Sequence, residues 1–219
     1  MAASRKTREA ARIAEIFDRF AAATADPRTE LRYASPFTLL VAVVLSAQAT
    51  DVSVNKATAR LYAAADTPAA ILALGEEDLI PFIAQIGLFR TKARNVIALS
   101  RLILERHDGA VPLDRAALEA LPGVGRKTAS VVLNELGVEP AIAVDTHVFR
   151  VAHRLALSAG KTPDQVEADL MRVVPEVRRT RAHHWLILHG RYVCVARAPK
   201  CATCLVGDLC PSRSLFVGV

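Results

Sequence analysis

Four cysteines of this 219-residue chain, Cys194, Cys201, Cys204 and Cys210, follow one another with the spacing Cys-x6-Cys-x2-Cys-x5-Cys. The N-terminus is charged rather than apolar, so we expect no secretory signal, reduced thiols and a single metal site rather than disulfides. Zinc sites with four cysteines usually contain two Cys-x2-Cys pairs, and only one is present here. The spacing therefore favours a bulkier iron–sulfur cluster but leaves the metal open. A catalytic thiol is the weaker alternative.

A glycine-rich turn, Leu121-Pro122-Gly123-Val124-Gly125, lies between two segments predicted to be helical. Glycine adopts positive φ without steric cost, so we expect Gly123 and Gly125 to turn the chain sharply and to present backbone N–H groups outward. A helix opening at about Arg126 would direct its free N–H groups to the same place, which suits a nucleic-acid phosphate. A plain helix–helix turn is the simpler alternative. A P-loop is excluded because Arg126 separates Gly125 from Lys127 and no strand precedes the turn.

Lys127 and Asp145 form a candidate reacting pair, each at the start of a predicted helix. Positive charge is concentrated near Lys127, which favours a neutral amine, and a neutral amine is a nucleophile. Asp145 follows an apolar run and precedes Thr-His-Val, where a helix begins. Taken singly, Lys127 is a phosphate contact and Asp145 is an N-cap. Together they would allow an amine to attack a sugar carbon while a carboxylate stabilises an oxocarbenium-like transition state.

The elements that must position these residues are all predicted to be helical. Ile13, Ile16, Phe17 and Phe20 recur with helical spacing and predict an amphipathic N-terminal helix. Pro81 predicts a kink or a short element after Gly75. No segment alternates apolar and polar residues as a strand would, so the fold class is all-α. The other helices are expected at about 36–47, 51–64, 67–75, 91–107, 114–120, 126–136, from 145, 162–175 and 181–189.

Composition and charge narrow the class of partner. Apolar residues make up 52% of the chain, which excludes disordered and collagen-like classes. The net charge is +6, which favours a polyanion such as nucleic acid, although many proteins are mildly basic. The longest apolar run, residues 37–49, is too short to span a bilayer and contains Ser46 and Gln48, so it predicts a buried helix. The expected location is the cytoplasm.

In combination and in this order, these features resemble the endonuclease III family of the helix–hairpin–helix Gly/Pro–Asp DNA glycosylase superfamily, iron–sulfur type. The resemblance covers the chain from about residue 30. The stretches that carry it, besides the four cysteines, are Leu-Ser-Ala-Gln-Ala-Thr-Asp at 45–51, Leu-Pro-Gly-Val-Gly-Arg-Lys-Thr-Ala at 121–129, Val-Asp-Thr-His at 144–147 and His-Trp-Leu-Ile-Leu-His-Gly at 184–190.

The resemblance implies two helical lobes that flank a DNA-binding cleft. Residues 29–139 would form a six-helix barrel lobe that contains the helix–hairpin–helix motif. Residues 1–28 and 140–219 would form a discontinuous lobe with an iron–sulfur loop at 194–210. The family further implies a bacterial-type cytoplasmic monomer that associates with the nucleoid through DNA binding and has no membrane partner.

The implied activity is that of a bifunctional DNA glycosylase and abasic-site lyase of base excision repair. Such an enzyme removes oxidised pyrimidines from duplex DNA and cleaves the strand by β-elimination. By the motif match, Lys127 would attack C1′ and form a Schiff base, and Asp145 would activate the lysine and support developing positive charge. A non-catalytic DNA-binding or redox-sensing module is the competing hypothesis, in which Lys127 only holds phosphate.

The family also suggests which residues contact double-stranded DNA at damaged pyrimidines or abasic sites. Gln48 and Leu88 match residues that fill the stack left by an extruded nucleotide. The ordinary alternatives are a helix cap for Gln48 and a core position for Leu88. The hairpin residues Gly123, Val124 and Gly125 would hold the phosphate backbone.

The implied cofactor is a [4Fe–4S] cluster, mainly structural, held by the four cysteines. Arg197 and Lys200 in its loop would contact phosphate. The chain departs from common family residues at Ala198, Pro81 and Ser130. Ser130 lies near the helix that carries Lys127, where it could influence substrate preference. The histidines His147, His184 and His189 are interpreted as polar groups of the core or around the site rather than as metal ligands.

Overall fold

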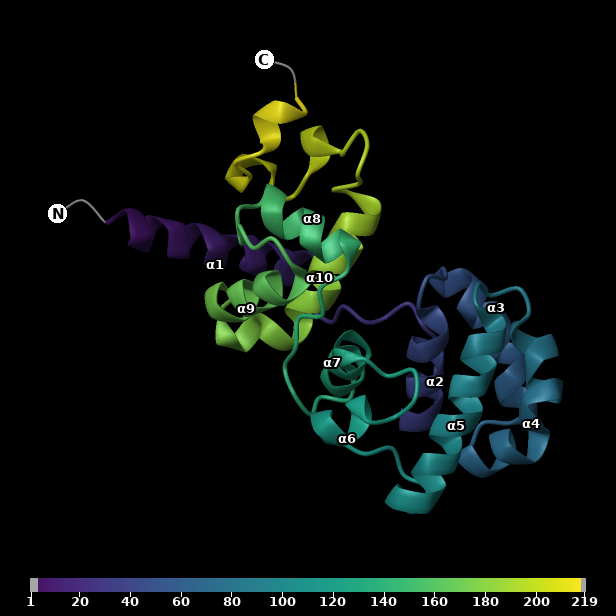
Figure 1. Cartoon of the computed structure of the whole chain (residues 1–219). Helices are drawn as coiled ribbons and strands as arrows, with labels where there is room; N and C mark the ends of the chain where they lie inside the picture. Colours follow the sequence, from purple (N-terminus) through teal and green to yellow (C-terminus); the bar gives the residue numbers. More distant parts are fainter. Residues whose placement is uncertain (1–3, 218–219) are drawn as a thin grey trace. The chain divides into compact units, whose positions relative to one another are not determined.

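The computed structural model describes residues 4–217, and within that range the chain contains helices and no strand, as the all-α prediction requires (Figure 1). Contacts divide the chain into two compact units, residues 29–139 and residues 1–28 with 140–219. The helices are α1 (Arg5–Ala23), α2 (Pro36–Ser46), α3 (Asp51–Ala64), α4 (Pro68–Ile83), α5 (Phe89–His107), α6 (Arg115–Glu119), α7 (Arg126–Glu135), α8 (Thr146–Arg154), α9 (Pro163–Val173) and α10 (Arg179–Tyr192). Short 3₁₀ turns are η1 (Glu176–Arg178), η2 (Cys201–Thr203), η3 (Gly207–Leu209) and η4 (Arg213–Leu215).

Helix α2 is the centre of the unit 29–139. Every residue from Phe37 to Leu45 is buried, and α3, α5 and α7 pack around it. The helix starts at Pro36, whose fixed φ suits a first helical position, and the Ser35 hydroxyl accepts a hydrogen bond from Thr38 N at 3.2 Å. The apolar run therefore forms a buried core helix, as predicted.

Helix α4 is broken where the sequence places a glycine. Gly75 has φ 77° and ψ 168°, so the backbone leaves the helical conformation there, and a second short helical piece follows. Pro81 lies inside that second piece. The predicted short element is present, and the sharp change of conformation falls at Gly75 because glycine accepts positive φ without the steric cost that other residues have.

The discontinuous unit is built from both ends of the chain. The α1 stripe of Ile13, Ile16, Phe17 and Phe20 is buried, which confirms the predicted amphipathic helix. This stripe shares one apolar core with residues of α8, α9 and α10. Trp185 of α10 lies 6.4 Å from Phe17 between ring centroids and donates its indole N–H to Thr24 O at 2.8 Å. The N-terminal helix is thus fixed to residues more than half the chain away.

Several predicted helix starts are confirmed by side-chain caps. Asp114 caps α6 by accepting a hydrogen bond from Ala117 N at 2.9 Å, and Thr162 caps α9. Helix α3 is capped by Thr50, and its first residue is Asp51, where the predicted range begins. No helix among residues 4–217 is long and apolar enough to cross a membrane.

The central position of α2 gives a test of the core. Leu40→Ala removes a side chain with 0% exposure from α2, which other helices surround. We expect the free energy of unfolding to fall by roughly 2–5 kcal/mol, because apolar burial is lost and a cavity is left behind. Val52→Ala on α3 is the matched control, because Val52 is 79% exposed and should change little. Urea denaturation followed by circular dichroism measures both. Equal losses for the two variants would contradict this packing.

Candidate functional site

The hairpin between α6 and α7 turns at Gly123. Its φ is +80°, and Val124 N donates to Leu121 O at 3.0 Å to close the turn. The Val124 side chain is only 5% exposed and anchors the turn in the core of the unit 29–139. A Cβ at Gly123 would lie 2.8 Å from Asn95 Nδ2 of α5, so both the φ angle and the close approach require glycine.

Gly125 plays a different part from the one predicted. Its φ is −99° and its ψ is 178°, an extended conformation open to any residue, so the expectation of positive φ at both glycines is wrong for Gly125. Gly125 is the N-cap of α7 and provides no side-chain cap. Its own chain neighbours aside, no described atom lies within 4 Å of the place where its Cβ would be. The start of α7 therefore has no side-chain cap, which leaves its first N–H groups for an outside acceptor such as an anion.

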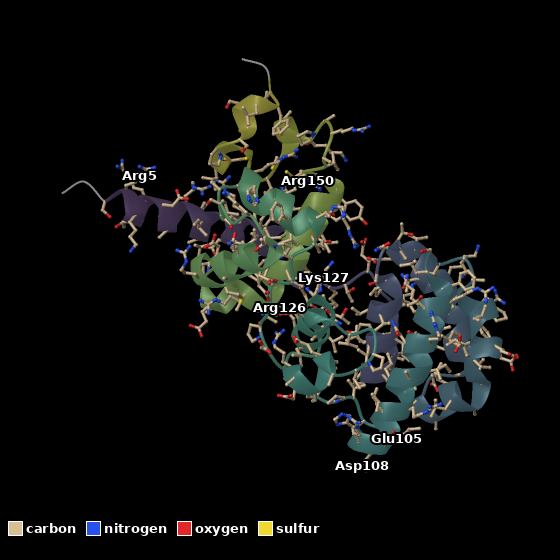
Figure 2. All side chains as sticks on the ribbon, viewed as in Figure 1. Arg5, Glu105, Asp108, Arg126, Lys127 and Arg150 are labelled. Atoms are coloured by element: carbon tan, nitrogen blue, oxygen red, sulfur yellow. The ribbon has the colours of Figure 1, made fainter. Side chains whose placement is uncertain are left out.

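Lys127 is the second residue of α7 and its side chain is exposed, next to Arg126 (Figure 2). Among the described residues of the unit 29–139, no hydrogen bond or ion pair holds its ammonium group. The hairpin thus places a long cationic side chain beside the open helix start, where a bound phosphate would also lie. Such a lysine is available to react or to bind phosphate.

Asp145 is the N-cap of α8. Its Oδ1 accepts hydrogen bonds from His147 N at 2.8 Å and Val148 N at 2.7 Å. A carboxylate is favoured there because the helix N-terminus carries partial positive charge. Both bonds use one oxygen, so the cap fixes the side chain and leaves Oδ2 without a hydrogen bond from the described residues of its own unit. Asp145 and Lys127 belong to different units, so their joint action stays a prediction.

Gln48 and Leu88 come together in the unit 29–139. Both are exposed non-glycine residues with left-handed backbone, φ 54° for Gln48 and 60° for Leu88. A Cβ on the neighbouring Gly87 would lie 3.7 Å from Gln48 O, which shows that the two loops are in contact. Leu88 is 59% exposed, so its alternative role as a core residue is wrong. A leucine held exposed in a strained conformation is typical of a functional position.

The four cysteines, all half-buried, line one cavity in the discontinuous unit. Burial is the main cause that raises the pKa of the Cys204 and Cys210 thiols, and the charges of the other cysteines add to it. Within residues 4–217, no group of three or more His, Cys, Asp or Glu side chains is arranged to hold a single metal ion. Four cysteine thiols around one cavity are a donor set that thiolate-bound metal centres use.

Two arginines of α8, which sequence reasoning missed, surround the first cysteine. Arg150 Nε donates to Cys194 O at 3.0 Å, and Arg154 Nη1 lies 3.5 Å from Cys194 Sγ and 2.8 Å from Val195 O. The Arg154 guanidinium also stacks 4.4 Å from the centroid of the Phe216 ring. Of the two, only Arg154 reaches the sulfur atom, whereas Arg150 binds the backbone carbonyl. Their spacing of four along one helix was the available signal.

The histidines behave as polar core groups. His189 is buried, lies 3.7 Å from Cys204 Sγ through Nε2, and packs at 5.1 Å between ring centroids against Phe20. Burial lowers the pKa of His189 to about 4, so the imidazole is neutral near pH 7. His184 is also buried, and His147 Nδ1 lies 3.2 Å from Arg150 Nη2.

The remaining predicted contact residues lie on the surface of their units. Arg197 and Lys200 are exposed in the cysteine loop, on either side of Ala198, which has φ 48°. Ser130 is buried instead and accepts a hydrogen bond from Arg115 Nη1 at 3.0 Å. Ser130 therefore belongs to the packing of α6 on α7 rather than to an outward face.

Comparisons with known proteins agree with this arrangement. Residues 41–176 match the family model described as HhH-GPD superfamily base excision DNA repair protein. Endonuclease III of Escherichia coli K12 is 58% identical over 90% of this chain and 93% of its own length, and that of Treponema pallidum is 57% identical over 91% and 95%.

Solved structures give the same answer for the whole chain. A trapped Endonuclease III–DNA covalent intermediate aligns with a TM-score of 0.86 at 41% identity, covering 98% of this chain and 99% of that one. A thermostable thymine-DNA glycosylase shares the fold, with a TM-score of 0.82 at 21% identity over 97% and 100% of the two chains. The chain therefore belongs to the endonuclease III family within the HhH-GPD superfamily of base excision DNA repair proteins.

Proposed function

We propose that Lys127 and Asp145 carry the chemistry of a base excision repair enzyme, a bifunctional DNA glycosylase and abasic-site lyase. The observation that carries the proposal is the exposed Lys127 ammonium at the open start of α7, directly after the Gly123 turn. A solved relative at 41% identity is a trapped covalent intermediate of Endonuclease III with DNA, which supports an enzyme nucleophile. An amine is the nucleophile that forms a Schiff base with a sugar aldehyde carbon.

The reaction proposed begins on a nucleotide extruded from the duplex, since C1′ cannot be reached within the stack. The neutral Lys127 amine bonds to C1′ as the glycosidic bond breaks, and the damaged base leaves with its electron pair and takes up a proton. Opening of the sugar ring converts this adduct into the Schiff base. Loss of a proton from C2′ then expels the 3′ phosphate by β-elimination. The Asp145 carboxylate stabilises the positive charge that develops at C1′ and accepts the proton of the lysine.

The surrounding residues are assigned to binding of double-stranded DNA that contains damaged pyrimidines or abasic sites. Gln48 and Leu88 fill the space left by the extruded nucleotide, and their contact through Gly87 supports one shared wedge. The hairpin residues 123–125 and the start of α7 bind backbone phosphate through N–H groups. Arg197 and Lys200, both exposed, add sequence-independent phosphate contacts.

The cofactor proposed is a [4Fe–4S] cluster held by Cys194, Cys201, Cys204 and Cys210. Cysteine thiolates are the usual ligands of such clusters. Bound iron would offset the free-energy cost of placing four half-buried thiols in one cavity. The cluster is assigned a structural role and supplies no step of the reaction above. Only one Cys-x2-Cys pair is present, whereas zinc sites with four cysteines usually contain two, which supports this choice over the zinc alternative.

The setting proposed for this enzyme is the bacterial cytoplasm, where it works as a monomer associated with DNA. Residues 29–139 are assigned to the six-helix barrel lobe, and residues 1–28 with 140–219 to the lobe that carries the cluster loop. The net charge of +6 fits a polyanionic partner.

Lys127→Ala tests the nucleophile. Borohydride added during reaction with duplex DNA containing thymine glycol or an abasic site should trap a covalent complex of the wild-type protein, and the variant should form none. Lys56→Ala on α3, also an exposed lysine of the same unit, is the control and should trap normally. Active wild-type protein that gives no adduct would remove the Schiff-base mechanism. Absence of any strand cleavage would favour the binding-only alternative.

Asp145→Asn separates the cap from the chemistry. Asparagine keeps the oxygen that accepts from His147 N and Val148 N, so the thermal midpoint should stay within a few degrees. The charge that supports the transition state is lost, so single-turnover base release should slow by roughly 100-fold or more. Asp114→Asn at the α6 cap is the control and should leave the rate unchanged. A rate for Asp145→Asn equal to that of the control would assign Asp145 to capping alone.

Metal analysis tests the cofactor. Protein purified without air should be yellow-brown and contain about four irons per chain, as a cubane cluster requires. Iron and zinc are counted on the same sample by mass spectrometry. Colourless protein with one zinc would overturn the iron assignment.

A further inference from the structure

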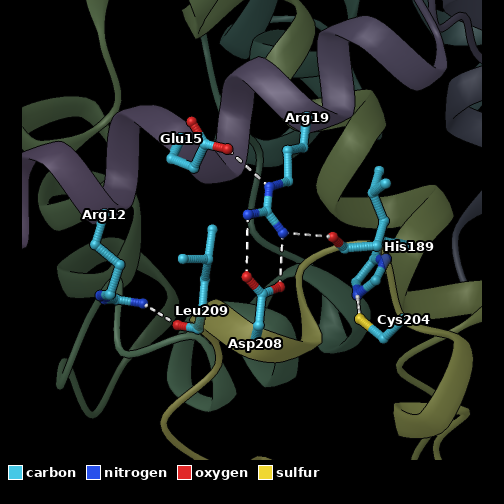
Figure 3. Close-up of polar contacts among 8 residues, drawn as sticks. Arg12, Glu15, Arg19, His189, Cys204, Asp208 and Leu209 are labelled. Carbon is cyan, nitrogen blue, oxygen red and sulfur yellow. Dashed lines mark hydrogen bonds and ion pairs between the residues drawn. The ribbon is translucent and has the colours of Figure 1, made fainter.

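The segment between Cys204 and Cys210 is held by the N-terminal helix. Arg19 Nη1 donates to Leu205 O at 3.1 Å, and Arg12 Nη1 donates to Leu209 O at 2.9 Å (Figure 3). These carbonyls belong to the residues adjacent to the two cysteines. The segment itself has a turn closed by Gly207 N and Cys204 O at 3.0 Å and one short 3₁₀ turn, Gly207–Leu209, and the bonds from α1 add to these local contacts.

An ion pair adds to these bonds. Arg19 Nη1 and Nη2 contact the two carboxylate oxygens of Asp208 at 2.6 and 3.0 Å, a bidentate geometry that fixes both partners. Glu15 Oε1 accepts from Arg19 Nε at 2.8 Å and orients the guanidinium from within α1.

The apolar side of α1 meets the same segment. Val206 is fully buried and belongs to the core cluster that contains Ile16, Phe17 and Phe20. Phe20 packs on His189, whose Nε2 lies 3.7 Å from Cys204 Sγ. Helix α1 therefore contacts the Cys204–Cys210 segment through backbone carbonyls, one carboxylate and one buried side chain.

We propose that α1 is a latch that retains the cofactor, and that Arg19 and Arg12 are positioning residues for the ligands Cys204 and Cys210. The proposal rests on the cluster assigned above. A cluster leaves its protein only when a ligand-bearing segment opens, and the frequency of opening is set by the local contacts that must break. Opening of this segment breaks the bonds from Arg19 and Arg12, whereas the rest of the unit can stay folded.

Arg19→Ala in the cluster-loaded full-length protein is the direct test. Loss of the iron–sulfur absorbance and release of iron to a chelator in air are followed together with the thermal midpoint. We expect cluster loss to be about five-fold faster than in the wild type, the scale of one well-formed partly exposed ion pair. Asp208→Asn preserves shape and removes the charge, so it should show a smaller acceleration in the same direction and covers the case in which Arg19→Ala folds poorly.

Arg178→Ala is the matched control. Arg178 of η1 also binds α1 within the discontinuous unit, through Asp18 Oδ1 at 2.7 Å, but no described bond joins it to the Cys204–Cys210 segment. Its variant should lower the thermal midpoint like Arg19→Ala while losing iron at the wild-type rate. Equal rates of iron loss in the Arg19 and Arg178 variants would overturn the latch, because α1 would then act only through general stability. Wild-type protein without iron would instead overturn the cofactor on which the latch rests.

Discussion

A helix that starts without a side-chain cap is the constraint on which the proposed chemistry depends. In α7, Gly125 supplies the cap position but no acceptor, so the first N–H groups remain available to an outside anion. The left-handed Gly123 and the buried Val124 hold the turn that aims this helix start, and Asn95 leaves no room for a side chain at Gly123. Lys127 follows within the first turn of α7, so the hairpin and this turn together provide both the phosphate-binding N–H groups and the amine.

Asp145 illustrates how one side chain serves folding and reactivity. The same two N–H bonds that satisfy the start of α8 also fix the rotamer of the carboxylate. Structural and catalytic interpretations of this residue are therefore compatible. The cap is the means by which the carboxylate is positioned, and no further residue is needed to orient it.

Much of the helical framework could be predicted from local patterns. The stripe of Ile13, Ile16, Phe17 and Phe20 and the helix that starts at about residue 114 each depend on neighbours within one or two turns. Both are confirmed. The left-handed backbone conformation of Gln48 and Leu88 could not be predicted. These residue types seldom adopt positive φ, and here the surrounding loops impose it.

The contacts of the cysteine loop lay beyond sequence reasoning for another reason. Arg12 and Arg19 contact residues about 190 positions away along the chain, and nothing in either segment's periodicity encodes the partner. The cysteine spacing predicted four neighbouring thiols, but the contacts of Arg12 and Arg19 with their loop follow from tertiary packing alone. Long charged side chains on a helix surface are ordinarily solvated, so their type gave no signal.

The use of both chain ends in one unit has a consequence for biosynthesis. Helix α1 leaves the ribosome first, yet the partners of its apolar stripe, in α8 to α10, are translated after the whole of residues 29–139. Residues 29–139 can fold during translation. Phe17 and Phe20, in contrast, have no packing partners until α8, α9 and α10 have been translated. Maturation of the cysteine loop therefore follows translation of the whole of residues 29–139.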